Sequence, residues 1–252
     1  MNIDIFVPIR LGSERLPKKA LKRINGKPIV KYLIERLEYS SNIRKIVVCT
    51  TTSEIDSELV DYLKTENIEY FRGDEHDILS RYNDAAKFFE TDFIVNVEGD
   101  DIYTDPTCVD IISKEFLDTN SDYIDIKNMP FGLSPSGIKV SALEKICSIK
   151  ESGNTETGYK RFFTESNLFK VRHIDLNTKF NFPTNTRLSL DYEEDYQLAI
   201  QIFNKIGNNF HKQDLLKLFE KNPDLLKITD GLEQRYQNHF KKNQTDISTR
   251  DI

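Results

Sequence analysis

A cluster of basic residues follows the first apolar stretch of the chain and is the clearest candidate for chemistry. The apolar run Ile3–Ile9 predicts a buried strand, and the segment from Arg10 to Lys27 then carries seven Lys or Arg residues against one acid, Glu14. The net charge of the whole chain is −6. Basic residues concentrated at one point of an acidic protein indicate an anionic ligand, and a nucleoside triphosphate suits several converging donors.

The residue types in this loop fit phosphate binding in different ways. Arg10 and Arg15 can each hold phosphate oxygens in a bidentate manner, whereas Lys19 supplies a compact charge. Gly12 lets the backbone approach a ligand closely, and Ser13 offers a hydroxyl donor. Three other basic residues of the segment are expected to be solvated: Lys18, Lys22 and Arg23.

Acidic residues follow two later apolar stretches. The run Phe93–Val97 predicts a central strand that leads into Glu98, Gly99, Asp100 and Asp101. Ligands of open parallel sheets bind beyond the carboxyl ends of the strands, and Mg²⁺ usually takes one or two carboxylates plus phosphate oxygens. Asp101 is either a second ligand or the cap of the following segment. Asp191 opens a predicted helix, so the sequence alone leaves it as an N-cap.

Alternating strand and helix patterns must position these residues. The further strands expected in the first half are Ile46–Cys49 and Ile68–Phe71. Three helices are expected: one that begins at Pro28 and buries Ile29, Leu33 and Leu37, one capped by Ser53 and Asp56 that buries Ile55, Leu59 and Leu63, and one from Asp77 to about Phe89. Repeated strand–helix units of this length predict a mostly parallel sheet with helices on both faces.

The alternation is looser in the second half of the chain. The expected elements are a helix at Pro106–Leu117, an extended stretch at Tyr123–Ile126, a loop at Met129–Gly137, strands at Lys170–Leu176 and Arg187–Leu190 that include an antiparallel pair, and a helix at Glu193–Ile206. We expect one domain over residues 1–232, with a subregion at about 125–185 for acceptor binding or dimerisation. Residues 233–252 are polar and predict an exposed helix or a frayed tail.

Composition excludes several classes of protein. The pI near 5.4 argues against a nucleic-acid binder, which is usually basic over its contact face. No apolar run reaches membrane-spanning length, and the chain enters a strand without a signal peptide, so no membrane insertion and a cytoplasmic location are expected. Three cysteines without metal-type spacing read as reduced, buried residues of such a protein: Cys49, Cys108 and Cys147.

The basic loop resembles the signature loop of the cytidylyltransferases. The residues that carry the resemblance are Arg10, Ser13, Arg15, Leu16, Pro17 and Lys19. Members of this family activate 3-deoxy-manno-octulosonate or sialic-acid-like sugars with CTP. Phe71-Arg72-Gly73 leading to Asp77, and the later stretch 214–225, are similar to the spore-coat polysaccharide branch. The resemblance implies an α/β, Rossmann-like three-layer nucleotidyltransferase fold with a mostly parallel sheet and a small antiparallel subregion.

The resemblance also implies a reaction and its residues. CTP would give CMP to an acidic sugar or phosphorylated acceptor, with Mg²⁺ and release of pyrophosphate, for cell-surface polysaccharide biosynthesis. Arg15, Lys19 and Asp100 would be catalytic, and Asp100 and Asp191 would bind the metal. The nucleotide-binding set is Pro8, Ile9, Arg10, Gly12, Ser13, Arg72, Arg81 and Glu98. For Arg72 and Arg81 an ion pair with a neighbouring acid, Asp74, Glu75 or Asp84, is the alternative. Lys160 and Arg161 either meet the acceptor or form the outer face of a helix, and a homodimer is implied because relatives are commonly dimers.

Two other functions stay open from the sequence. A glycosyltransferase with the same sheet would need an Asp-x-Asp motif, which Gly99-Asp100-Asp101 is not. A nucleotide-binding relative without catalysis is compatible with two departures from the family. Glu98 replaces a neutral residue, and 158–163 replaces a histidine-bearing segment. The sequence alone distinguishes neither cytosine from other bases nor one acceptor from another.

Overall fold

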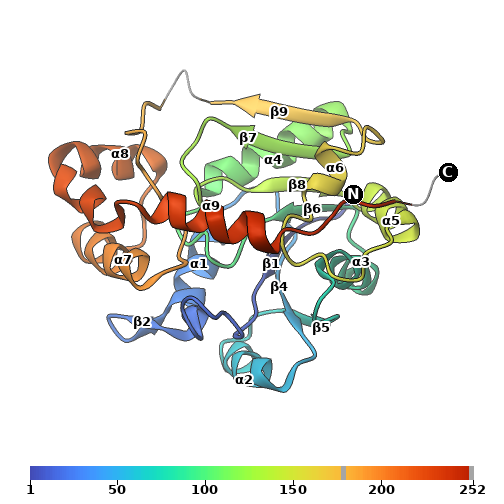
Figure 1. The fold of residues 1–252 in the computed structure, drawn as a ribbon, viewed down its shortest axis with the longest axis horizontal. Helices are drawn as coiled ribbons and strands as arrows, with labels where there is room; N and C mark the ends of the chain where they lie inside the picture. The colour runs from blue at the N-terminus through green and yellow to red at the C-terminus, as the bar shows by residue number, and fades with distance from the viewer. Residues whose placement is uncertain (177–179, 250–252) are drawn as a thin grey trace.

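The computed structural model describes residues 1–176 and 180–249, and within them one large sheet runs through the middle of the molecule (Figure 1). Its strand order is β5-β4-β1-β6-β8-β7-β9. The strands are β1 (Ile3–Pro8), β4 (Lys45–Thr51), β5 (Tyr70–Gly73), β6 (Phe93–Asn96), β7 (Tyr123–Lys127), β8 (Ser136–Lys139) and β9 (Val171–Asp175). Only β8 is antiparallel to its neighbours in this sheet, and the short hairpin β2 (Arg23–Ile24) and β3 (Lys27–Pro28) lies outside it.

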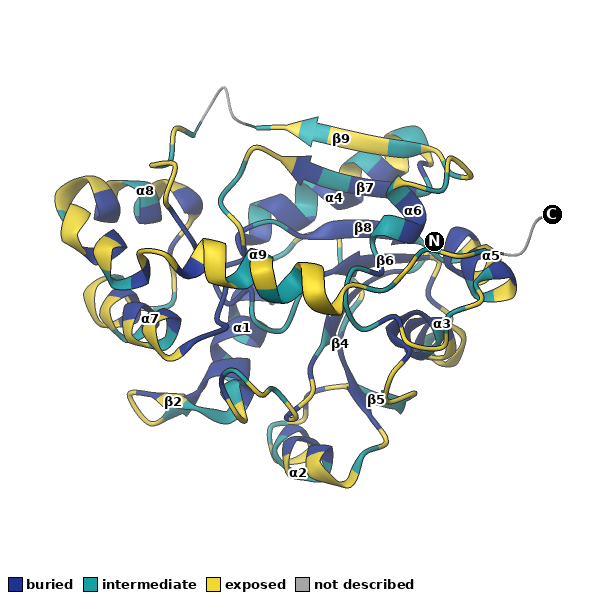
Figure 2. Cartoon of the chain, in the orientation of Figure 1, coloured by how far each residue is buried: buried dark blue, intermediate teal, exposed yellow. Residues whose placement is uncertain are grey.

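Helices cover both faces of the sheet, which gives three layers. One face is covered by α1 (Ile29–Leu37), α2 (Ser57–Thr65) and α4 (Pro106–Thr119). The other is covered by α3 (Ile78–Phe89), α5 (Val140–Ile149) and α6 (Arg161–Thr164). Figure 2 shows the central strands buried and the outer faces of these helices exposed. The predicted three-layer α/β fold is therefore confirmed, and no helix among the described residues is long and apolar enough to cross a membrane.

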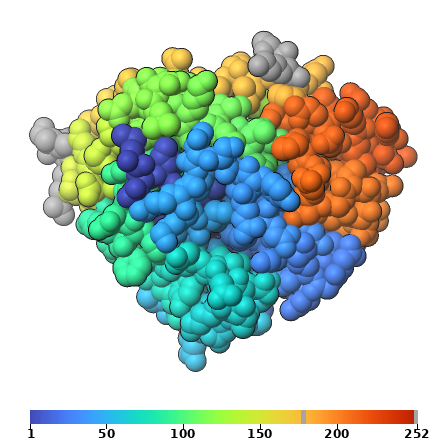
Figure 3. Space-filling view, turned by 180° about the vertical axis from the view of Figure 1, so that it is seen from behind, coloured from blue at the N-terminus to red at the C-terminus, as the bar shows by residue number. Residues whose placement is uncertain are grey.

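The last third of the chain builds a lobe beside the sheet. α7 (Glu193–Ile206), α8 (Lys212–Lys221) and the 3₁₀ helix η3 (Pro223–Thr229) share a second apolar cluster. In the view from behind, the orange residues of α7 and α8 gather at one side next to the blue N-terminal part (Figure 3). α9 (Leu232–Asn243) then returns across the front of the sheet (Figure 1). Residues 250–252 of the expected tail and 177–179 of the expected subregion lie outside the described residues.

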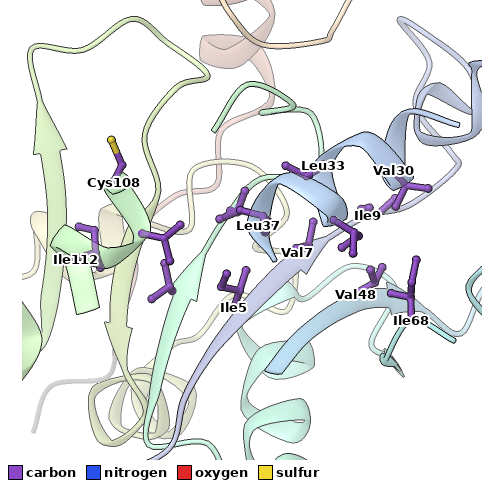
Figure 4. Close-up of a cluster of buried hydrophobic side chains, with 14 of the residues drawn as sticks. Ile5, Val7, Ile9, Val30, Leu33, Leu37, Val48, Ile68, Cys108 and Ile112 are labelled. Carbon is purple, nitrogen blue, oxygen red and sulfur yellow. The ribbon is translucent and has the colours of Figure 1, made fainter. Parts of the chain in front are cut away.

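The core beside β1 fixes the end of that strand. Ile5 and Val7 of β1 point towards Leu33 and Leu37 of α1 (Figure 4), and all four side chains are fully or almost fully buried. β4 and β6 cover the two edges of β1, and the helices on either side of the sheet bury both of its faces, as its uninterrupted apolar run predicts. This packing sets where the basic loop leaves the sheet.

Two strand predictions were wrong. Arg187–Leu190 is not a strand, because only Arg187 forms an isolated parallel bridge, with Phe131. The antiparallel strand is instead β8, whose first residues lie in the expected Gly- and Ser-rich loop. A Cβ atom at Gly137 of β8 would lie 2.3 Å from the ring of Phe93, so only glycine fits this strand beside the aromatic core.

The predicted caps of α2 were also wrong. Neither Ser53 nor Asp56 caps a helix with its side chain, and Ile55 is 47% exposed rather than buried. The Asp56 carboxylate is instead fully buried and accepts hydrogen bonds from the Leu11 N–H (2.6 Å) and from the Thr51 hydroxyl. Asp56 therefore fixes the start of the basic loop.

The fully buried carboxylate of Asp105 joins α4 to α8 and predicts an acid-sensitive fold. It accepts from the N–H groups of Thr107 (2.8 Å) and Lys212 (2.6 Å). Burial alone would raise the pKa of Asp105, but these hydrogen bonds outweigh burial and lower the pKa to about 2. The pKa of this carboxyl is about 4 in the unfolded chain, so its lower pKa in the folded protein stabilises the fold at pH values above 4. We expect about 2 kcal/mol of unfolding free energy to be lost as the pH falls from roughly 4 to 2.

Urea unfolding of wild type and Asp105→Asn from pH 7 down to pH 2.5 measures this contribution. The stability difference should be largest at pH 7 and shrink towards pH 2.5, because the Asp105 carboxyl becomes protonated in the unfolded wild-type chain while it stays largely ionised in the folded protein. A difference that stays constant over this range would contradict the account.

Candidate active site

A cleft of about 820 Å³ lies beyond the carboxyl ends of β1 and β6. It is lined by the loop after β1, the turn after β6, residues 129–136 and 154–161, and the inner side of α9. This is the position where open α/β sheets bind ligands. The structure thereby brings together Arg15, Lys19, Asp100 and Asp191, which are far apart in the sequence.

Lys19 joins the two predicted metal-binding aspartates. Its ammonium lies 2.6 Å from Asp100 Oδ2 and 3.2 Å from Asp191 Oδ1, and it also donates to the carbonyl of Leu190 at 2.9 Å. The guanidinium of Arg15 pairs with the same Asp191 oxygen. Two carboxylates therefore share two cations at the centre of the cleft.

Arg187 is a part of the site that the sequence did not indicate. Its buried guanidinium donates to Asp191 Oδ2 at 2.6 Å, to Asp195 Oδ1 at 3.3 Å and to Glu233 Oε2 at 3.1 Å. The Asp195 carboxylate accepts from the N–H groups of residues 191 and 192 at the start of α7. Asp195 thus does the capping, and both oxygens of Asp191 are held by side chains instead.

The shared cations shift the pKa values of these groups in different directions. Burial raises the pKa of Asp100, and the charge of Lys19 offsets this only in part. Burial would also raise the pKa of Asp191, but Lys19, Arg15 and Arg187 outweigh burial and lower it. The pKa of Lys19 is raised, because the two aspartates outweigh its own burial, so the ammonium stays charged.

A third acid, Asp101, belongs to the same turn. Burial, together with the negative charges of Asp100 and Glu98, raises the pKa of Asp101 well above its usual range. Among the described residues, no group of three or more His, Cys, Asp or Glu side chains could hold a metal ion. Asp100 and Asp191 still suit Mg²⁺, because Mg²⁺ needs only one or two protein carboxylates when phosphate oxygens and water complete its ligands.

Much of the positive charge of the basic segment is paired with acidic residues that the fold brings to it. Three of its lysines form ion pairs with acids from other parts of the chain: Lys18 with Glu58, Lys22 with Glu193 and Lys27 with Glu35. The cleft itself is lined by six Lys or Arg side chains and seven carboxylates of the described residues. The basic residues of the segment are therefore largely paired inside the protein, and net charge alone does not measure how strongly the cleft attracts an anion.

Glu98 forms the centre of a second polar cluster, at the β8 side of the cleft. One of its oxygens, Oε1, accepts from Lys160 Nζ (2.8 Å), the Tyr159 hydroxyl (2.8 Å) and Asn96 Nδ2 (3.1 Å). Burial would raise the pKa of Glu98, but Lys160 outweighs it and lowers the pKa. Lys160 lines the cleft, yet its charge is already matched by Glu98.

The remaining arginines occupy different positions. The buried guanidinium of Arg81 donates to Glu156 Oε1 at 2.7 Å, and Arg10 Nε lies 3.5 Å from Glu156 Oε2. Arg161 lies at the edge of the cleft and pairs with Glu165. Arg72 does not line the cleft, because its guanidinium is held by backbone carbonyls at the end of β4 and beyond, those of residues 51 and 53.

Four residues of the predicted nucleotide-binding set come from the end of β1 and the loop that follows it. Pro8, Ile9, Gly12 and Ser13 all line the cleft, next to the arginines and Lys19. The roles of the predicted residues stay predictions. Sequence reasoning missed the roles of three residues: Asp56, Glu156 and Arg187. Asp56 and Glu156 bind partners more than 40 positions away. Arg187 binds residues of α7 and α9, and no sequence pattern linked these helices to the site.

Comparison with known proteins decides the family. The sequence profile described as cytidylyltransferase matches residues 5–247 of the chain. The chain belongs to the cytidylyltransferase family. It is thus a CTP-dependent nucleotidyltransferase, as the signature loop around Arg15 and Lys19 implied, and the glycosyltransferase alternative is set aside.

Three relatives show how far the similarity extends. This cytidylyltransferase is 30% identical to an uncharacterized protein of Methanocaldococcus jannaschii, over 93% of the chain and 97% of the relative. It is 26% identical to the spore coat polysaccharide biosynthesis protein SpsF of Bacillus subtilis, over 89% of the chain and 97% of SpsF. The solved structure of a cytidylyltransferase from Leptospira borgpetersenii superposes with a TM-score of 0.81 at 25% identity, over 98% of this chain and 100% of that one. The predicted resemblance to the spore-coat branch is confirmed.

Proposed function

We propose that this cytidylyltransferase transfers CMP from CTP to an acidic sugar or a phosphorylated acceptor, with Mg²⁺, and releases pyrophosphate. The product would serve cell-surface polysaccharide biosynthesis, as the name of the SpsF relative suggests. The observation that carries the proposal is the meeting of Lys19, Asp100 and Asp191 at the centre of a cleft lined by the signature loop.

The charge balance of the cleft supports a divalent ion. A triphosphate brings about four negative charges, and six cations against seven carboxylates leave no surplus to receive them. A magnesium ion held by Asp100 and Asp191 would supply the missing positive charge and act as a Lewis acid at the phosphate. The carboxylates fit this task because Arg187 and Lys19 fix their orientation.

The chain's own residues then have distinct tasks. Arg15 and Lys19 stabilise the negative charge that grows on the departing pyrophosphate as the bond to the α-phosphorus breaks. Arg10, Ser13 and the backbone of Gly12 orient the triphosphate. Asp56 keeps the loop in place through its hydrogen bond to the Leu11 N–H. Preorganised charges of this kind supply most of the catalysis in phosphate chemistry.

A pyrophosphate-release screen tests the proposal. CTP, UTP, ATP and GTP are each combined with acidic sugars, sugar phosphates and phosphonates, with Mg²⁺ or with EDTA. We expect release with CTP and at least one acidic acceptor, and its loss when EDTA removes the metal. No release from any combination, together with thermal stabilisation by CTP, would favour the non-catalytic nucleotide-binding alternative.

A further inference from the structure

Helix α9 closes the front of the cleft with one of its faces. Side chains at a helical spacing, Tyr236, His239, Phe240 and Asn243, line the cleft, whereas Asn238 on the other side is exposed. Figure 1 shows α9 passing in front of the central strands. Burial of apolar side chains contributes little to the stability of α9, because Leu232 is its one buried residue.

Both ends of α9 are tied to the walls of the cleft. At the N-terminal end, Glu233 accepts from Arg187, which also holds the Asp191 carboxylate. Beyond the C-terminal end, the Thr245 N–H donates to the Thr157 carbonyl at 2.9 Å, and the Thr245 hydroxyl donates to the Asn154 carbonyl at 2.9 Å. The helix thus bridges the cleft from the Asp191 side to segment 154–161.

Tyr236 is the residue of α9 that reaches the centre. Its ring lies 4.8 Å from the ring of Phe131, and the guanidinium carbons of Arg187 and Arg15 lie 4.9 Å and 5.5 Å from its centroid. Burial and the negative charges of Asp191 and other nearby carboxylates raise the pKa of Tyr236, so its hydroxyl stays neutral.

The position of Tyr236 indicates which substrate it meets. Tyr236 contacts Arg15, which the proposed function places on the departing pyrophosphate, and its partner Phe131 belongs to loop 129–136, on the β7 and β8 side of the cleft. The predicted nucleotide contacts Arg10 and Arg81 meet elsewhere, at Glu156. An aromatic ring offers a flat apolar surface with a negative face, which suits the C–H face of a sugar ring. Phe131 and Tyr236 present two such rings together.

We propose that α9 is the roof of the acceptor site and that the ring of Tyr236 packs against the sugar ring of the acceptor. This proposal rests on the proposed function. The roof proposal assigns acceptor selectivity to α9, which is separate in sequence from the basic loop and from Asp100 and Asp191. Acceptors with a ring that exposes a C–H face should therefore be preferred over open-chain phosphates.

The test uses the full-length chain and the acceptor that gives the highest rate in the pyrophosphate-release screen. Tyr236→Ala should raise the KM for that acceptor by about tenfold, whereas the Kd for CTP with Mg²⁺, from titration calorimetry, should change less than twofold. Tyr236→Phe keeps the ring and should stay within about threefold of wild type. Asn238→Ala, on the outer side of α9, is the matched control and should leave both constants unchanged.

Each result gives a decision. An unchanged acceptor KM in Tyr236→Ala overturns the roof proposal while the proposed function stands. Equal losses in CTP affinity and acceptor KM also overturn it, because they place Tyr236 on the nucleotide. A Tyr236→Phe variant as defective as Tyr236→Ala overturns the packing of the ring. A wild-type protein without turnover overturns the proposed function, and the roof proposal with it.

Discussion

Replacing Lys19 by methionine should lower kcat/KM for pyrophosphate release by roughly 10²–10³-fold. The substitution keeps the length and apolar stem of the side chain but removes the charge that Asp100 and Asp191 share. Two carboxylates then face each other without it, and the growing charge of the pyrophosphate loses a donor. Steady-state assays with the acceptor from the screen, at saturating Mg²⁺, measure the loss.

Lys22→Met is the matched control for this variant. Lys22 lies three residues further along the same segment, pairs with Glu193 and does not line the cleft. Its activity should equal that of wild type. A Lys19→Met protein that is folded by circular dichroism and retains kcat/KM within threefold of wild type would remove Lys19 from the catalytic set.

The largest loss of stability is expected for Arg187→Met. This variant removes the buried guanidinium that Asp191, Asp195 and Glu233 share. Within the part of the chain that the structure describes, Asp195 then has no cationic partner, and Asp191 keeps only Arg15 and Lys19, at its other oxygen. Breaking a buried ion pair on one side costs about 3–5 kcal/mol of unfolding free energy. Urea denaturation at pH 7 measures this cost, and Arg235→Met, an exposed arginine of α9, should change stability by less than about 0.5 kcal/mol.

A double variant separates the charge effect from lost packing. Asp195→Asn removes one of the carboxylates that Arg187 neutralises. The variant Arg187→Met/Asp195→Asn should therefore be more stable than the sum of the two single effects predicts, by at least 0.5 kcal/mol. Strict additivity would mean that the charge of Arg187 is not coupled to that of Asp195.

Local patterns predicted the elements that depend on local physics. β1, β6 and α7 agree with the apolar runs and helical spacing that indicated them, and Asp77 caps α3 as predicted, with its side chain accepting from the Ser80 N–H. The signature loop was found because its spacing lies within ten residues. Asp100 was found because it follows a buried strand directly.

Residues that act across the chain could not be found in this way. A helix-capping role was expected for Asp56, but its carboxylate is bound by Leu11, 45 positions away. Arg187 looked like the start of a strand, whereas its function depends on Asp195 and on Glu233 of a distant helix. Net charge pointed to an anionic ligand but not to the pairing within the site, because composition counts the basic residues of the loop and not the acids that the fold brings to them.

The internal neutralisation of the cleft determines which anions can compete for it. Sulfate, free phosphate and the backbone of RNA arrive without a tightly bound divalent ion, and they would have to displace Asp100, Glu156 or Asp191 from a cation already satisfied. A nucleotide that carries its own magnesium brings the compensating charge with it. If the proposed magnesium-dependent reaction holds, this cytidylyltransferase would therefore select its substrate partly by the counter-ion that accompanies it.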